Sequence, residues 1–283
     1  MKFENTDVYG FEHALRGMRN PKESWNRSDS HWVEETVLSS DDESYTCHRF
    51  NIGENDMELA QRLIQAGSEH RKFMRQIVVW VDITAPMYWW KEFDTYKVGT
   101  VANSTSTMHR LTSSPITMEC FEIDDMDQNA EIDSLTNTSD FMMAVVSHCE
   151  QIRQKYLETK DKKYWKELIR ILPESWLQKR TVTMSYENLF AICGKGQRRF
   201  HKLNEWSGMD KPQVYNFIAW ARTLPYAKDL IFLDEDHSTQ TLSFTARNSL
   251  IGAIRTKHSD SGCTVNENIN DSNKRNTEHE TGI

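Results

Sequence analysis

The chain has few cysteines, and their spacing matches neither a disulfide framework nor a zinc knuckle. Five cysteines are scattered over 283 residues, and no two of them form a Cys-x-x-Cys pair. An odd number of isolated thiols is typical of a reducing compartment, where cysteines stay free. They are Cys47, Cys120, Cys149, Cys193 and Cys263.

Long apolar runs and an excess of basic charge are also missing. No run approaches the roughly 20 apolar residues of a membrane-spanning helix, and the opening MKFENTDVYGF lacks the basic-then-apolar pattern of a secretion signal. The net charge is −8, so no overall basic field attracts nucleic acid or an acidic membrane surface. We therefore expect a cytoplasmic protein without membrane or nucleic-acid partners, in which any phosphate site is a local arrangement.

Common catalytic and nucleotide-binding motifs are absent as well. The sequence contains no Gly-x-Gly-x-x-Gly, no Walker A motif and no recognisable Ser-His-Asp arrangement. His148 and Cys149 are adjacent and diverge on a helix, so we predict no metal site. The composition, 38% hydrophobic and 27% charged, is that of a globular protein.

The apolar pattern predicts an α+β fold that is mostly helical with a small central sheet. Residues 76–83 and 177–184 are rich in β-branched residues and are the predicted strands. We expect one domain over residues 1–256, followed by a polar tail, 257–283, that cannot bury a core. The predicted loops are 22–44 and the acidic insertion 124–138. The predicted helices are 9–19, 55 or 56 to 66, one from Pro86, one capped by Ser139 or Asp140, 162–171, one capped by Ser185, and 213–223.

One loop has the composition of a binding site. The segment from Lys97 to Ser106, KVGTVANSTS, combines small hydroxyls and an amide with a glycine. Such groups and exposed N–H groups suit a phosphate or the polar edge of a flavin, but ordinary surface loops share this composition. Trp80, Trp89 and Trp90 form either a flat aromatic wall beside it or part of the core.

Two basic clusters are further candidates. Residues 70–75 (HRKFMR) are either an anion site at an element boundary or a solvated turn. Residues 198–202 (RRFHK) are the densest basic patch. His201 and Glu205 stand at helical spacing, where they either share a proton or form a surface salt bridge.

Residues 83–110 contain Ala85-Pro86, then Trp89-Trp90 and Lys91-Glu92. This segment resembles the flavin-dependent thymidylate synthases, which methylate dUMP using FAD. It matches the family's Ala-Pro and aromatic helix, and Lys91-Glu92 replaces its Arg-Gln. The family signature, RHRxxSxNxxSxRY, appears here in altered form. Its positions are Thr95-Tyr96-Lys97, Thr100, Asn103, Ser106 and Met108-His109.

Three more segments extend the resemblance to roughly residues 10–230. Arg16-Gly-Met-Arg19 resembles the family's early R-x-x-R helix, and Gly67-Ser-Glu-His70 its Gly-His-Glu turn. The segment 169–173, which contains Arg170, resembles an Arg-x-x-Leu-Pro segment. The departures are Thr95 for arginine, Tyr96 for histidine and Ser104 for an acidic residue.

The resemblance implies the family's fold, a homotetramer with sites between subunits, and FAD as cofactor. It also implies NADPH and methylenetetrahydrofolate as co-substrates, and dUMP or another pyrimidine nucleotide as substrate. The residues implied for the flavin are Tyr96, Lys97, Thr100, Asn103 and Ser106. Those implied for the nucleotide are Lys91, Glu92, Ser104, Thr105 and Arg170.

The catalytic candidate is Arg198. Its permanently charged guanidinium suits two parallel hydrogen bonds to a uracil edge and would stabilise enolate character in the ring. Arg199 and Lys195 are alternatives as the activating cation. The remaining alternative is that Arg198 and Arg199 lie on a solvated turn and have no catalytic role. A relative with a different modification reaction, or a non-catalytic nucleotide binder, fits the altered signature too.

Overall fold

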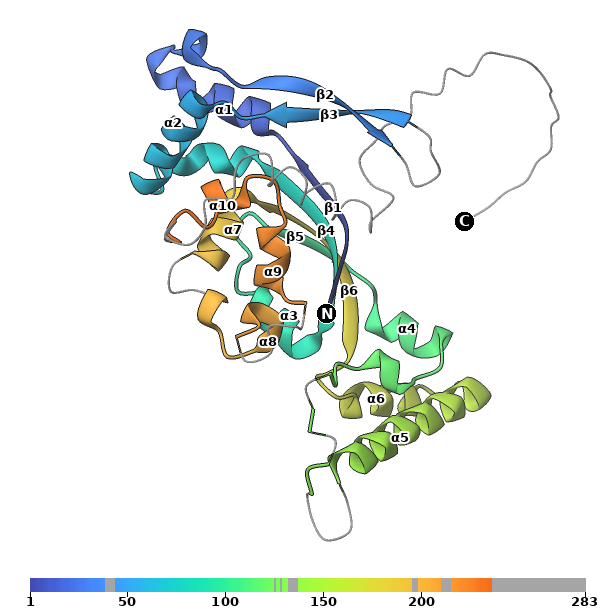
Figure 1. The fold of residues 1–283 in the computed structure, drawn as a ribbon. Coiled ribbons are helices and arrows are strands. Elements are labelled where there is room, and N and C mark those ends of the chain that lie inside the picture. Colours follow the sequence, from blue (N-terminus) through green and yellow to red (C-terminus); the bar gives the residue numbers. More distant parts are fainter. Residues whose placement is uncertain are drawn as a thin grey trace, which may run out of the picture.

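The computed structural model describes residues 1–38, 44–124, 126–127, 129–131, 137–194, 198–209 and 215–235. A four-stranded antiparallel sheet runs through the middle of the molecule (Figure 1). Its order is β1 (Lys2–Tyr9), β4 (Val78–Pro86), β6 (Leu177–Ser185) and β5 (Val101–Ser104). A separate hairpin, β2 (His31–Leu38) and β3 (Ser44–Asn51), lies at one end of the molecule.

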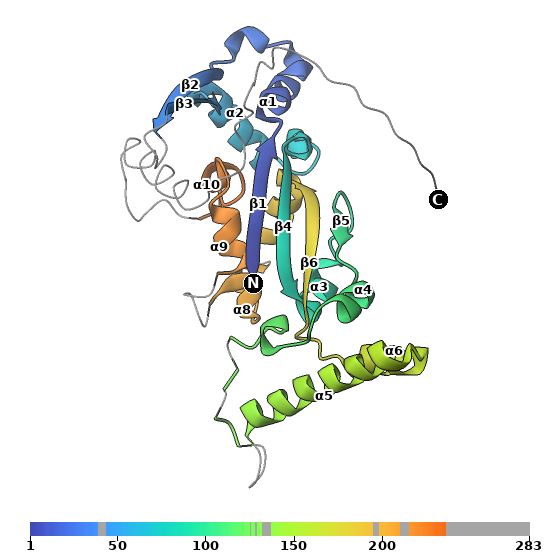
Figure 2. The ribbon, with the colours of Figure 1, turned by 90° about the vertical axis from the view of Figure 1, so that its right-hand side faces the viewer.

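One face of the sheet is covered and the other is open. Val79, Val81 and Ile83 of β4 are fully buried, and they alternate with the more exposed Trp80 and Asp82, as expected for a half-buried strand. Helices lie on the covered side, as two views show (Figures 1 and 2). They are α3 (Met87–Phe93), α7 (Tyr186–Cys193), α8 (Asn204–Ser207), α9 (Phe217–Arg222) and α10 (Ala227–Leu230).

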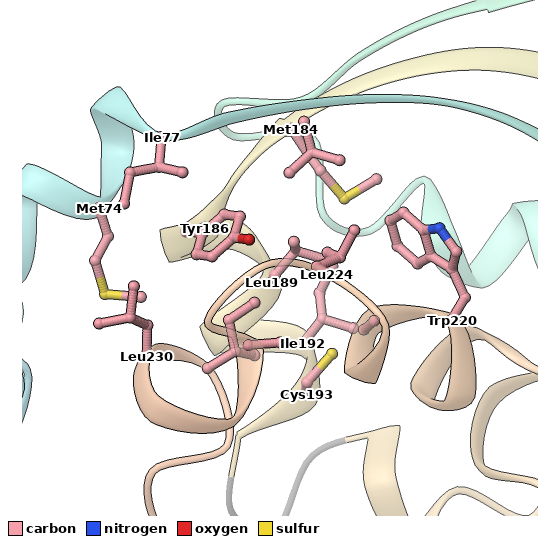
Figure 3. Packing of buried hydrophobic residues seen from close by; sticks show 14 of the residues in the cluster. Met74, Ile77, Met184, Tyr186, Leu189, Ile192, Cys193, Trp220, Leu224 and Leu230 are labelled. Carbon is pink, nitrogen blue, oxygen red and sulfur yellow. The ribbon is translucent and has the colours of Figure 1, made fainter. Parts of the chain in front are cut away.

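The main core forms where this face meets the helices. Figure 3 shows Met184 of β6 and Tyr186 of α7 beside side chains of α9 and α10. Tyr186 donates its hydroxyl to the carbonyl of Pro225 at 2.6 Å, so its one polar group is satisfied. Burial raises the pKa of Tyr186 well above its usual value. The core therefore joins the sheet to the C-terminal helices.

A second hydrophobic cluster lies at the end of the sheet farthest from the hairpin. It is formed by α4 (Thr107–Ser113), α5 (Thr138–Thr159) and α6 (Lys162–Ile171). Leu111, Val146 and Leu168 are among its buried side chains. Among the described residues, no helix combines the length and apolarity that crossing a membrane requires.

A buried ion pair anchors α1 (Phe11–Arg19) to α2 (Glu54–Gln65). Arg19 Nε donates to Asp56 Oδ1 at 2.5 Å, and both side chains are buried. Ser28 and Ser30 each donate to the other Asp56 oxygen at 2.6 Å. Asp56 is therefore an anchor and not the helix cap predicted for it. The carboxylate of Asp29 instead accepts from the backbone N–H groups of residues 55 and 56.

Locally encoded elements match the sequence prediction best. Helix α6 spans the predicted residues, and Ser185 caps α7 in a capping box with Asn188. Helix α5 is capped by Asn137, which accepts from the N–H of Asp140 at 2.8 Å, so the predicted caps at 139 and 140 are wrong. The helix predicted at 213–223 is shorter than predicted: α9 begins at Phe217 after the cap Asn216 and ends at Arg222, and 213–214 lie outside the described residues.

Two predictions near the N-terminus are wrong. Residues 22–44, predicted as a loop, contain β2, and the helix predicted from residue 9 begins at Phe11, after strand β1. Strand β1 depends on β4, a partner distant in sequence, whereas β2 pairs with β3, the next strand along the chain. The tail 257–283 and residues 125, 128 and 132–136 of the insertion lie outside the described residues.

Candidate functional site

The signature segment leaves α3, turns at Gly99 and runs as β5 along β6. Gly99 has a φ of 78°, a value that glycine adopts without strain. Thr100 Oγ1 donates to the carbonyl of Tyr96 at 2.7 Å. Ser106 Oγ accepts from the N–H of His109 at 3.4 Å and caps α4. Thr105 N–H donates to the carbonyl of Lys179 at 2.9 Å. These side chains and backbone groups shape the loop.

Other polar groups of the segment face outward. Lys97, Asn103 and Ser104 are exposed, and across the described ranges no residue accepts from or donates to their side chains. Strand β5 is the last strand of its sheet, so its outer edge presents unpaired N–H and C=O groups. This edge is therefore available to a ligand or to another chain.

Two residues of β6 that the sequence analysis did not select hold this loop in place. The Nε2 of the buried Gln178 donates to the carbonyl of Thr105 at 2.9 Å. Arg180 donates to Gln178 Oε1 at 2.9 Å and to Asp94 Oδ1 at 2.8 Å. Its guanidinium carbon lies 4.2 Å from the centre of the Trp90 ring. The sequence signal for both was polar residues at alternate positions of a predicted strand.

The residue proposed as catalytic meets two other predicted site residues. Arg198 Nε donates to Tyr96 Oη at 2.9 Å, and Nη1 forms an ion pair with Glu92. The guanidinium carbon lies 4.9 Å from the centre of the Trp206 ring and 5.4 Å from that of Tyr96. Arg198, Tyr96, Glu92 and Trp206, together with His201, are called the Arg198 cluster below.

His201 completes the cluster in its neutral form. Its Nε2 lies 3.2 Å from Glu92 Oε2, and its Nδ1 accepts from the N–H of Leu203 at 3.1 Å. An Nδ1 that accepts carries no proton, so the ring proton is on Nε2. Burial lowers the pKa of His201, Glu92 opposes this effect, and Arg198 adds to it.

The pairing of His201 with Glu205 suggested by their spacing does not occur. His201 precedes α8, so the two residues are not on one helix. The buried Glu205 instead accepts from the hydroxyl of Tyr88. Glu92, which is distant in sequence, takes the place that Glu205 was predicted to hold.

The tryptophans support the site from within the core. Trp89 and Trp90 are fully buried, and the ring of Trp206 stacks on Trp89 with centroids 4.5 Å apart. Trp80 lies on the open face of the sheet, 6.0 Å from the ring of Tyr9. The core alternative for Trp89 and Trp90 is therefore correct, and neither forms an exposed wall.

The geometry also limits how Arg198 can bind a ligand. Nε and Nη1 are engaged by Tyr96 and Glu92, and in the described part of the chain no residue accepts from Nη2. Nη2 is thus the donor that is ready for a ligand. Both N–H groups of Nη2 and the second N–H group of Nη1 remain for a ligand, because Tyr96 and Glu92 each accept only one N–H.

The remaining candidates lie outside the Arg198 cluster. Lys91 pairs with Glu174 at 2.6 Å on the surface. Arg170 is exposed on α6, which packs on α5 at the far end of the sheet. Arg199 donates to Asp234 at 2.8 Å and to Glu235 at 2.9 Å. Where residues are described, no group of His, Cys, Asp and Glu suits a metal ion.

Comparison with known proteins identifies the fold. No protein-family model and no curated protein matches the sequence. Two crystal structures of the flavin-dependent thymidylate synthase ThyX from Helicobacter pylori, both with FAD and dUMP, have a similar fold. One has a TM-score of 0.53 and 16% identity, with 83% of this chain and 99% of that chain covered. The other has a TM-score of 0.55 and 16% identity, with 83% and 98% covered. The chain therefore has the fold that the resemblance predicted.

Proposed function

We propose that this protein is a flavin-dependent enzyme that methylates dUMP to dTMP, with FAD as cofactor and with NADPH and methylenetetrahydrofolate as co-substrates. The observation that supports this most is the fold, which covers 99% of a synthase whose structure contains FAD and dUMP. The Arg198 cluster and the exposed edge of β5 supply chemistry that suits this reaction.

The exposed groups of the signature segment fit the polar parts of FAD. Lys97 offers a cation for phosphate and Asn103 an amide on an unpaired strand edge, and Ser104 offers a hydroxyl on the same edge for the nucleotide. Tyr96 is already bound to Arg198, and Thr100 and Ser106 bond within the loop. We assign Lys97 and Asn103 to binding FAD and Ser104 to binding the nucleotide. We assign Thr100 and Ser106 to shaping the loop. Bound flavin would supply the redox step.

Arg198 would act on the pyrimidine ring. C5 of uracil is a weak nucleophile, and a fixed cation beside a ring oxygen stabilises enolate character. We assign the free N–H groups of Nη2 to that oxygen. Trp206 lies beneath the guanidinium and keeps its plane in place.

A second candidate function is a different modification of a pyrimidine nucleotide. Thr95 and Tyr96 replace the first two signature residues, and the Glu92–Arg198 ion pair occupies the proposed catalytic group. A non-catalytic nucleotide binder is the remaining alternative. Growth of a thymidine-requiring host that expresses this chain would indicate methylation, and failure of growth with flavin and dUMP bound would favour the second candidate.

We expect the purified protein to bind FAD and, once loaded, dUMP. Lys97→Ala and Asn103→Ala should each weaken FAD binding by about tenfold, because each removes a hydrogen-bonding group from the bound phosphate or flavin edge. Flavin absorbance after gel filtration measures the bound FAD, and titration calorimetry measures the affinity for FAD and for dUMP. Lys22→Ala, an exposed lysine outside the site, is the control and should change nothing. Unmodified protein that binds no added FAD would contradict the proposal.

We also expect a homotetramer. In the resembled family the sites lie between subunits, and the outer edge of β5 is open in one chain. Light scattering at micromolar concentration should give about four times the chain mass, and shortening the tail at Lys257 should leave the assembly intact. A monomer under these conditions would remove the model of a shared site.

A further inference from the structure

His201 is a partly buried titratable group with no role in the chemistry described so far. We infer that His201 is a positioning residue: in its neutral Nε2–H form it fixes Glu92, and through Glu92 it holds the guanidinium of Arg198 on Trp206. This role rests on the proposed function only for its effect on nucleotide binding. The arrangement of the side chains does not depend on the reaction.

A continuous set of contacts supports this role. The N–H of Leu203 donates to His201 Nδ1 at 3.1 Å, and Nε2 reaches Glu92 Oε2 at 3.2 Å. The same Oε2 accepts from Arg198 Nη1. A backbone N–H thus sets the tautomer of the ring, the ring sets the position of the carboxylate, and the carboxylate sets the position of the guanidinium.

Glu92 needs such support because it is a partly exposed side chain near the end of a short helix. About a third of the side chain of Glu92 is exposed, against less than a fifth for Arg198 and for His201. A flexible, solvated carboxylate loses entropy when it holds one geometry, and this loss cancels much of the gain from an exposed ion pair. A second donor from a fixed imidazole restricts the carboxylate and makes its contact with Arg198 persistent.

The surroundings keep His201 neutral. Burial is the largest effect and lowers the pKa of His201; Arg198 and Lys202 also disfavour the protonated form, whereas Glu92 of α3 and Glu205 of α8 favour it. Protonation at Nδ1 would also break the hydrogen bond from Leu203. The ring of Trp206 lies edge-on to the imidazole, with centroids 6.4 Å apart. These groups favour a fixed hydrogen-bond donor over a second cation beside Arg198.

Two substitutions of His201 distinguish the effect of its N–H donor from the effect of its aromatic ring. His201→Phe keeps an aromatic ring beside Trp206 and removes the donor, whereas His201→Gln keeps an N–H donor at nearly the same reach. In ¹⁵N NMR spectra, solvent exchange of the Arg198 Nε–H should rise about tenfold in His201→Phe and stay within about threefold in His201→Gln. The dissociation constant of dUMP should change in parallel. His13→Phe, at an exposed site on α1, should change neither.

Several results would overturn the role of His201. One is an Arg198 Nε–H signal that does not change in His201→Phe. Another is solvent exchange of the Arg198 Nε–H that rises as much in His201→Gln as in His201→Phe. A third needs no variant: ¹⁵N shifts of the unmodified protein that place the ring proton on Nδ1. If the unmodified protein binds no dUMP, the proposed function fails, while the Arg198 signal still decides whether His201 positions it.

Discussion

Replacement of Arg198 with lysine is expected to lower turnover by ~100-fold or more while FAD stays bound. The guanidinium binds Tyr96 and Glu92 through two nitrogens and presents a third. An ammonium group is a single compact charge and cannot hold this arrangement in one plane. Steady-state rates with dUMP, together with flavin absorbance, measure the two effects separately.

Arg199 provides the matched control for this experiment. Its guanidinium donates to Asp234, Glu235 and the carbonyl of Cys193, outside the Arg198 cluster. Arg199→Lys should therefore leave turnover within a few-fold of the unmodified enzyme. Unchanged turnover in Arg198→Ala would show that the assignment is wrong. Arg199 and Lys195, which lies outside the described residues, would then be tested as the activating cation.

Replacement of Asp56 with alanine is expected to lower the free energy of unfolding by about 3–5 kcal/mol, because it leaves a buried arginine without its partner. Arg19 is 4% exposed, and Asp56 is fully buried. The hydroxyls of Ser28 and Ser30 lose their acceptor at the same time. Urea unfolding followed by tryptophan fluorescence measures the change.

The same carboxylate should make stability depend on pH. Burial raises the pKa of Asp56, but hydrogen bonds from Ser28, Ser30 and Arg19 outweigh burial and hold the pKa below its usual value. The folded state therefore binds fewer protons than the unfolded state, and the stabilisation is present above the unfolded pKa. It is lost as the pH falls below about 4. Asp56→Ala should lack this part of the acid dependence.

Asp82 is the control for Asp56. It lies on the open face of the sheet and accepts from Thr181 at 2.6 Å and from Asn5 at 2.9 Å. Asp82→Ala should cost about 1 kcal/mol, because at an exposed site water can replace the lost carboxylate as the acceptor for Thr181 and Asn5. Equal losses in the two variants would contradict a buried ion pair between Arg19 and Asp56.

The sequence by itself determined the elements whose signals are local. Helix α6 has the predicted bounds, and the cap of α7 lies at the predicted Ser185, because capping and helical periodicity involve residues a few positions apart. The motifs at residues 83–110 were enough to identify the fold, which the similar crystal structures confirm. The sequence also determined which types of hydrogen-bonding side chain the signature loop contains.

Only the tertiary structure decided which of those groups bond within the chain and which remain open. Glu92 and Tyr96 contact Arg198 across 106 and 102 residues of sequence, and no spacing rule relates positions so far apart. The neighbour of His201 was predicted as Glu205 from helical spacing, whereas the fold supplies Glu92. Strand β1 was missed for the same reason. Its residues are mostly polar, and it is a strand because β4 offers hydrogen bonds along its length.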